Sequence, residues 1–234
     1  MQIAFKTDVG RVRASNQDAL IISEDNKLFG VADGMGGHKG GNVASALAAE
    51  TVLTQLDGLK PSEKHLYKSI IAANQAVYAM QLKKSELAGM GTTLTVLWES
   101  DERLILGHVG DSRAYLLRDG SLRQISTDHS LIQELLSQGV LTLEQAKVHP
   151  YKHVITRAVG TDYSVEPDIA SFDKKSDDVW MVCSDGLTEY VEDKEIEDSL
   201  KRLSIDECVR WLIDQALSRG GRDNISVVIA RTDK

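Results

Sequence analysis

The sequence is poor in cysteine, proline and aromatic residues, and these shortages exclude several classes of protein. Its 234 residues include 2 cysteines and 3 prolines, and 5% of them are aromatic. Two cysteines are too few for a disulfide framework or for a zinc site built from thiolates. No Pro/Ser-rich stretch or run of charges divides the chain, so we expect a single domain over residues 1–234.

Long apolar segments and an excess of basic residues are also missing. No segment approaches the roughly 20 apolar residues that a membrane helix needs, and residues 1–6 lack the features of a signal peptide. The net charge of −8 is the opposite of the basic footprint that nucleic-acid binding requires. We therefore expect a cytoplasmic protein that binds neither nucleic acid nor membrane, with a monomer as the default.

Hydrophobic patterning predicts strands and helices that are grouped in blocks. Strands are expected at residues 19–22, 28–32, 92–98, 103–109, 114–117, 122–125, 179–183 and 225–230. Helices are expected at residues 42–56, 62–87 and 204–217, with short, broken helices at 129–147 and a loop-rich segment at 148–170. This order favours an α+β layered sandwich over alternating βαβ units.

Four aspartates are tied to these apolar runs. Asp33, Asp111 and Asp185 follow a run directly, and Asp223 stands just before one. Each alone is a common turn or capping residue. Together they can converge at one edge of a sheet, where clustered carboxylates repel each other unless a cation neutralises them. An oxygen-only ligand set suits magnesium or manganese, and two such ions about 3.5–4 Å apart form a known device for phosphate-ester hydrolysis.

A glycine-rich stretch follows the first of these aspartates. Five glycines fall within residues 33–41, so the backbone there turns tightly or is closely approached. A nucleotide-binding loop is the rival interpretation. The P-loop ending is absent, however, and Lys39 occupies the place of the third glycine in the dinucleotide pattern. We therefore interpret the stretch as a loop that wraps a metal-ligating aspartate.

Six ordered motifs extend this interpretation along nearly the whole chain. They are Arg13-Ala14-Ser15-Asn16-Gln17-Asp18-Ala19, Val31-Ala32-Asp33-Gly34-Met35-Gly36-Gly37-His38, Gly89-Met90-Gly91-Thr92-Thr93, Gly107-His108-Val109-Gly110-Asp111-Ser112-Arg113, Cys183-Ser184-Asp185-Gly186-Leu187-Thr188 and Gly221-Arg222-Asp223-Asn224-Ile225-Ser226-Val227. With these motifs the sequence resembles the type-2C metal-dependent protein phosphatases (the PPM family), specifically their compact bacterial serine/threonine members.

The resemblance implies both a fold and an activity. The fold is a four-layer α-β-β-α sandwich, in which helices flank two antiparallel sheets, with a metal cleft at one end. A small flap subdomain is expected at roughly residues 129–170. The activity is hydrolysis of phosphoserine and phosphothreonine esters by in-line attack of a water that bridges two divalent ions. Such an enzyme would reverse a serine/threonine kinase, which is the expected partner besides the phosphoprotein substrates.

The resemblance also assigns ligands for two or three manganese or magnesium ions. Asp33, Asp185 and Asp223 match the carboxylates of the two-metal core, and Asp33 is counted with the catalytic residues as well. Gly34 matches a position that contributes its backbone carbonyl. Asp111, together with Asp185, matches the site of a third, weaker ion.

Three further residues are expected to act beside the ions. Asp18 matches the acidic residue that orients metal-bound water or touches the second ion. Arg13 matches the residue that grips the substrate phosphate, and its planar fork suits that role. Met35 stands where eukaryotic relatives carry a histidine proposed as general acid. His38 or a metal-bound water would then donate the proton, while a loop histidine bonded to its neighbours is an equal alternative for His38.

Two other functions fit parts of this pattern. A pseudophosphatase would keep the fold as a binding module and lose a core carboxylate, whereas here none is lost at the matched positions. A different two-metal hydrolase would act on nucleotides or small phosphate esters. The relative rates on phosphopeptides and nucleotides separate this alternative from a protein phosphatase.

Overall fold

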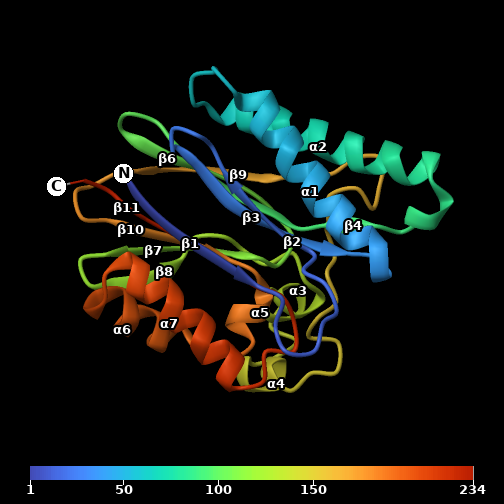
Figure 1. Ribbon diagram of the computed structural model, residues 1–234. Helices are drawn as coiled ribbons and strands as arrows, with labels where there is room; N and C mark the ends of the chain where they lie inside the picture. Colours follow the sequence, from blue (N-terminus) through green and yellow to red (C-terminus); the bar gives the residue numbers. More distant parts are fainter. Residues whose placement is uncertain (234) are drawn as a thin grey trace.

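Two antiparallel sheets form the centre of the protein (Figure 1). The computed structural model describes residues 1–233, apart from the side chains of residues 37–39. One sheet has the strand order β1 (Gln2–Asp8), β11 (Ile225–Arg231), β10 (Val179–Cys183), β7 (Arg113–Arg118) and β8 (Ser121–Gln124). The other has the order β2 (Asp18–Ile22), β3 (Leu28–Met35), β5 (Leu94–Glu99), β6 (Arg103–Val109) and β9 (Asp168–Asp173), and the short β4 (Gly91–Thr92) pairs with β3.

Strand β10 shows why its residues form a buried strand. Trp180 and Val182 point between the two sheets, where they pack with residues of the opposite sheet such as Phe29. Met181 and Cys183 point the other way, against helices. Successive side chains of a strand alternate between its faces, so a strand buried on both sides reads as a continuous apolar run.

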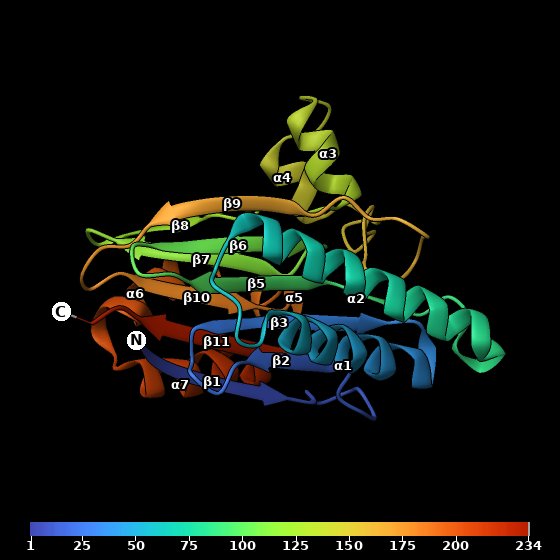
Figure 2. The same ribbon diagram turned by 90° about the horizontal axis from the view of Figure 1, so that it is seen from above.

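Helices cover the outer face of each sheet (Figures 1 and 2). The pair α1 (Gly37–Leu56) and α2 (Glu63–Lys83) packs on the sheet that contains β3, followed by the short 3-10 helix η1 (Ser85–Leu87). The pair α6 (Asp193–Arg202) and α7 (Ile205–Ser218) packs on the sheet that contains β10. The expected four-layer sandwich is therefore confirmed. Among the helices of residues 1–233, none is long and apolar enough to cross a membrane.

The short helices α3 (Leu131–Ser137) and α4 (Leu143–Lys147) project from the sandwich beside β9 (Figure 2). We call residues 129–167 the flap. The segment expected to be rich in loops, residues 148–170, includes the first three residues of a strand. This strand, β9, begins at Asp168 and pairs with β6. This edge strand was missed because its side chains are only partly buried and its sequence lacks a continuous apolar run.

The glycine-rich stretch differs from the expected long loop. Strand β3 continues to Met35 and α1 begins at Gly37, so the turn is confined to Gly36, whose φ is 123°. Glycines in the first turns of α1 serve close packing instead. A Cβ added at Gly41 would lie 2.7 Å from the Gln17 Oε1 atom. The stretch is thus a tight strand-to-helix junction and not a loop, while the metal-ligating role of Asp33 stays a prediction.

The layer between the two sheets should dominate stability. Leu97 is fully buried there, so Leu97→Ala should lower the free energy of unfolding by about 2–5 kcal/mol. Leu82 lies on α2 and is 71% exposed, so Leu82→Ala should change it by no more than about 0.5 kcal/mol. Urea unfolding of both variants measures the difference. Equal losses of stability would contradict the assignment of Leu97 to this layer.

Candidate active site

Two of the expected site residues face each other on neighbouring strands. Asp18 begins β2 and is paired in register with Asp33 of β3. Directly opposite residues of antiparallel strands have Cβ atoms about 4.5–5.5 Å apart. Asp33 lies inside β3 and not at its end, because the strand continues for two residues toward Met35. The pairing therefore fixes two carboxylates side by side at one edge of the sheet.

Three more aspartates reach the same place from other strands. Asp185 begins the short helix α5 (Asp185–Thr188), just after β10, and Asp223 lies just before β11, the antiparallel neighbour of β10. Asp111 follows β6. The negative charges of these three aspartates and of Asp18 all raise the pKa of Asp33. The structure thus brings together the five expected carboxylates.

Burial makes this cluster unfavourable for negative charge. It raises the pKa of Asp33 well above its ordinary range, and the neighbouring carboxylates raise it further. Burial also raises the pKa of Asp111 to about 8, with the charge of Asp185 adding to the shift. The pKa of Asp185 is raised by burial and by the charge of Asp223. Such perturbed carboxylates are typical of functional sites, where a bound cation offsets the repulsion.

Asp18 joins the two sheets within the cluster. Its Oδ2 atom accepts hydrogen bonds from the hydroxyls of Ser184 (2.9 Å) and Ser226 (2.6 Å), which belong to the β10–β11 side. Burial raises the pKa of Asp18 to about 6, although both hydroxyls lower it. Its Oδ1 atom is buried and has no hydrogen-bond partner within residues 1–233. A buried carboxylate oxygen of this kind is suited to a cation.

The donor set fits hard divalent cations. It consists of carboxylate oxygens in a desolvated pocket, which is the ligand chemistry of magnesium and manganese. In the part of the chain that the structure describes, no three acidic, histidine or cysteine side chains converge closely enough to hold one ion. One reason is that Asp223 is turned toward Arg13. Binding of an ion therefore requires side chains of the cluster to turn toward it.

Arg13 forms a two-pronged ion pair with that aspartate. Its Nε and Nη2 atoms donate to the two carboxylate oxygens of Asp223 at 2.9 and 2.7 Å. The Arg13 side chain is 54% exposed, so its guanidinium group lies at the surface of the cluster. The expected phosphate-binding residue and an expected metal ligand are thus partners of each other in this structure.

The buried Asn224 holds the loop that carries Arg13. Its Oδ1 atom accepts from the backbone N–H of Gln17 at 2.8 Å. Its Nδ2 atom donates to the carbonyl oxygens of Val9 at 2.9 Å and Ser15 at 3.1 Å. One side chain therefore fixes both ends of the loop. The sequence did not predict this role, although Asn224 belongs to the motif of residues 221–227.

Gly34 is closely surrounded by backbone. A Cβ added there would lie 2.1 Å from the carbonyl oxygen of Gly41 and 2.6 Å from that of Gln17. Its own N–H donates to the Gln17 carbonyl at 3.1 Å. The position therefore demands glycine, and contribution of its carbonyl to an ion stays a prediction.

Hydroxyl groups that sequence reasoning gave no role support Asp33. The backbone N–H of Asp33 donates to Thr93 Oγ1 at 2.9 Å, and its carbonyl accepts from Thr92 Oγ1 at 2.9 Å. Thr93 Oγ1 also shares a 2.7 Å hydrogen bond with Ser112, next to Asp111. The threonine pair thus links two of the ligand-bearing segments. The sequence feature that could have indicated this role is the recurrence of serine and threonine in the motifs that contain the aspartates.

The flap is tied to the Asp111 turn through His129. The backbone N–H of Gly110 donates to the ring atom Nδ1 of His129 at 3.0 Å. The backbone N–H of His129 donates in turn to the Gly110 carbonyl at 2.7 Å. Burial lowers the pKa of His129, which favours the neutral ring that can accept at Nδ1. His38, the candidate proton donor, has a side chain outside the described part of the chain, so its role stays a prediction.

The arrangement can be compared with known proteins. A family model described as protein phosphatase 2C matches residues 10–219. The chain belongs to this family. Among its relatives is the serine/threonine phosphatase stp of Listeria welshimeri, 38% identical over 239 residues that cover 98% of this chain and 95% of the relative. The serine/threonine protein phosphatase PstP of Mycobacterium tuberculosis is 40% identical over 98% of this phosphatase 2C chain, which spans 45% of the length of PstP.

Solved structures of this family agree with the fold. The crystal structure of M. tuberculosis PstP has a TM-score of 0.94 at 39% identity and covers 100% of this chain and 99% of that chain. The catalytic domain of PstP has also been solved in complex with two manganese ions. That structure has a TM-score of 0.91 at 38% identity and covers 100% of this chain and 98% of that chain. The similarity therefore extends over the whole sandwich and the flap.

The role of Asn224 can be tested by deleting its side chain. Asn224→Ala leaves three backbone groups of the Arg13 loop without their partner, so stability should fall by about 1–3 kcal/mol. Amide hydrogen exchange should become faster at Gln17. Gln55→Ala, which removes an exposed amide side chain of α1, is the control and should leave both measurements unchanged. Unaltered exchange at Gln17 in Asn224→Ala would refute the assigned role.

Proposed function

We propose that this chain is a metal-dependent protein phosphatase that hydrolyses phosphoserine and phosphothreonine esters. The observation that carries the proposal is the convergence of five carboxylates, buried or half-buried, around Asp33, with the Asp18 Oδ1 atom left without a partner among the described residues. Crowded carboxylates destabilise a fold unless a cation joins them. The names of the relatives, serine/threonine phosphatases in each case, support the choice of substrate class.

The proposed ligands follow from the positions of the carboxylates. Asp33, Asp185 and Asp223 would hold two manganese or magnesium ions, together with the carbonyl of Gly34. Asp111 would hold a third, weaker ion with Asp185. When bound, such ions supply an activated water and neutralise charge on the transferred phosphoryl group. Two manganese ions in the PstP catalytic domain support this number.

The other polar residues would act around this centre. Asp18, fixed by two serine hydroxyls, would orient water with its free Oδ1 atom. Arg13 would exchange its pairing with Asp223 for the phosphate, whose oxygens offer the same two-pronged geometry. His38 would give a proton to the departing serine or threonine oxygen, since Met35 has no proton to donate.

Cellular context is proposed from the same residues and relatives. The substrates would be the phosphoproteins of a serine/threonine kinase, the kinase included, in the cytoplasm. The net charge of −8 supports a protein that does not bind nucleic acid. We further propose that the chain acts as a monomer with a single catalytic domain.

Activity should depend on both the ions and their ligands. With a phosphothreonine peptide, manganese or magnesium should support hydrolysis and a chelator should abolish it. Asp185→Asn should lower kcat/KM by more than about 100-fold. Loss of a residue that hydrogen-bonds to a metal ligand typically costs about 10–100-fold in activity, and loss of a ligand itself should cost more. Manganese titration of the variant, followed by electron paramagnetic resonance, should show weakened binding.

Two controls define the result. Asp101→Asn changes an exposed aspartate outside the cluster and should leave kcat/KM unaltered. Nucleotides tested in parallel should be poorer substrates than the peptide. Hydrolysis that survives the chelator, or faster hydrolysis of nucleotides, would overturn the proposed function.

The Arg13 pair gives a test that separates phosphate binding from metal binding. Arg13→Ala should lower kcat/KM by about 10–100-fold, the value of a charge-assisted hydrogen bond to phosphate. The same change frees Asp223, so manganese affinity should stay equal or rise. The control is Arg11→Ala, on the same loop, because Arg11 donates to the carbonyl of Leu217 and not to the cluster. Its kcat/KM should be much closer to that of the unmodified protein. Weaker manganese binding in Arg13→Ala would contradict the division of roles.

A further inference from the structure

A deep cleft separates the flap from the segment that follows the ligand Asp185. Its volume is about 720 Å³, which is within the range of pockets that bind small molecules. Helices α3 and α4 line one side, and α5 with residues 189–194 lines the other. Asp111 and Asp185 lie on its wall, so the cleft is continuous with the candidate metal centre.

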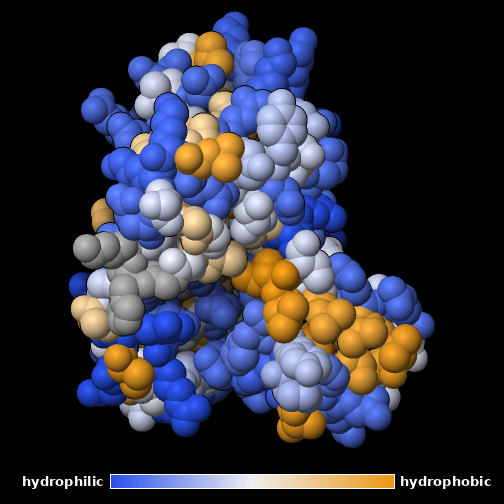
Figure 3. Space-filling model, turned by 90° about the vertical axis from the view of Figure 1, so that its right-hand side faces the viewer, coloured by the Kyte–Doolittle hydropathy of each residue, from blue (hydrophilic) through white to orange (hydrophobic). Residues whose placement is uncertain are grey.

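Apolar side chains from both sides line this cleft. They are Ile132, Leu136, Leu143, Ala146 and Val191. Leu143 is 73% exposed. Figure 3 shows apolar side chains gathered over the projecting flap, at the lower right of the view. The exposed large apolar residues of the flap are Val140, Leu143, Val148, Tyr151, Val154 and Tyr163, and Leu143 is the one among them that lines the cleft.

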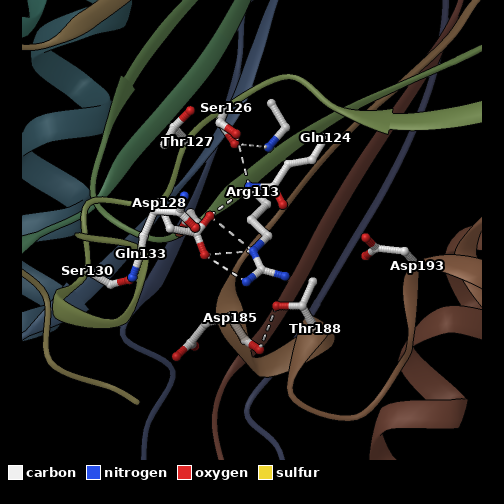
Figure 4. A network of polar contacts seen from close by, with 12 residues as sticks. Arg113, Gln124, Ser126, Thr127, Asp128, Ser130, Gln133, Asp185, Thr188 and Asp193 are labelled. Atoms are coloured by element: carbon white, nitrogen blue, oxygen red, sulfur yellow. Dashed lines mark hydrogen bonds and ion pairs between the residues drawn. The ribbon is translucent and has the colours of Figure 1, made fainter. Parts of the chain in front are cut away.

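The base of the cleft is held in place by a buried network (Figure 4). Arg113 of β7 donates from Nε and Nη2 to Asp128, just before the flap, at 2.9 and 2.7 Å. Gln124 Nε2 donates to the same carboxylate at 2.7 Å. This network neutralises the charges of Arg113 and Asp128, while Asp111, Asp185 and Asp193 leave acidic groups in the lining. It also fixes the start of the flap relative to Asp185, so the cleft is largely formed before a ligand enters.

The rim of the cleft is closed by weaker contacts. Lys147 lies 3.9 Å from Glu192, and Lys152 lies 3.4 Å from Glu189, each pair crossing from the flap to the opposite side. Lys147 and Glu192 are largely exposed, Lys152 and Glu189 are partly exposed, and exposed ion pairs contribute only about 0–1 kcal/mol. The pairs can therefore open for an entering chain. Once they open, an entering chain meets the apolar residues of α3 and α4 that line the flap side of the cleft.

We propose that this cleft binds an apolar side chain of the phosphoprotein substrate, close in sequence to the phosphorylated residue. The inference rests on the proposed function, because it takes the phosphate to lie at the aspartate cluster. A substrate chain bound there and extended toward the flap enters the cleft directly, since Asp185 lies in both places. The occupant is a leucine-like side chain, which would be buried against Leu143 and Leu136.

A set of phosphothreonine peptides tests this proposal. The parent peptide has serine at all positions near the phosphothreonine, and each other peptide carries one leucine at a single position on either side. With manganese present, one position should raise kcat/KM about tenfold over the parent, the discrimination that an apolar pocket provides. The remaining positions should give values close to the parent.

Variants of exposed leucines show where the preference arises. Leu143→Gln should reduce the leucine-to-serine ratio of kcat/KM from about tenfold to about onefold. The control, Leu82→Gln on the distant helix α2, should keep the full ratio, and both residues are exposed enough for the fold to tolerate the change. In a methyl-labelled protein, the unphosphorylated leucine peptide should shift the signals of Leu143 and Leu136, and the serine peptide should not.

The outcomes separate this inference from the function on which it rests. Hydrolysis of all peptides at equal rates leaves the phosphatase intact and overturns the cleft proposal. No hydrolysis of any peptide with either ion overturns both. Concentration-dependent self-association that disappears in Leu143→Gln would show that a second copy of the chain covers the apolar residues, and that result too would overturn the proposal.

Discussion

The repulsion among five crowded carboxylates is the constraint on which the rest of the structure depends. Asp18 and Asp33 are neighbours in one sheet, while Asp185 and Asp223 come from the other. Burial and mutual charge raise the pKa of Asp33 well above its ordinary range. A fold keeps such a cluster only if the surrounding packing is strong enough to hold it. The continuous layer of apolar residues between the sheets provides that packing.

Short hydrogen-bonding side chains turn this packing into a defined geometry. Ser184 and Ser226 reach from one sheet to Asp18 on the other, and Thr93 holds the backbone of Asp33 while contacting Ser112. These hydroxyls fix the carboxylates without adding charge. Each of them stands beside a ligand-bearing segment, which explains why serine and threonine recur within the motifs that contain the aspartates.

Much of this site could be predicted from sequence, but its contacts could not. Asp185 and Asp223 were found because they border β10 and β11, whose burial on both faces produces unbroken apolar runs. Edge strands β1 and β9 were missed because their side chains are partly exposed and alternate with polar residues. The pairing of Arg13 with Asp223 joins residues far apart in sequence, and no local pattern encodes it. The hydrogen bonds from Asn224 to the loop that carries Arg13 also join distant residues, and no local pattern encodes them either.

The flap differs from the ligand cluster in what holds it. Its base is fixed by the Arg113–Asp128 pair and by His129 on Gly110, contacts that are substantially buried. Its outer part meets the opposite side of the cleft through Lys147 and other exposed charges, which solvent screens. A small motion of the flap tip can therefore change the width of the cleft without disturbing Asp111 or the other carboxylates. Because the two regions depend on separate contacts, the flap can vary in sequence while the geometry of the carboxylates is kept.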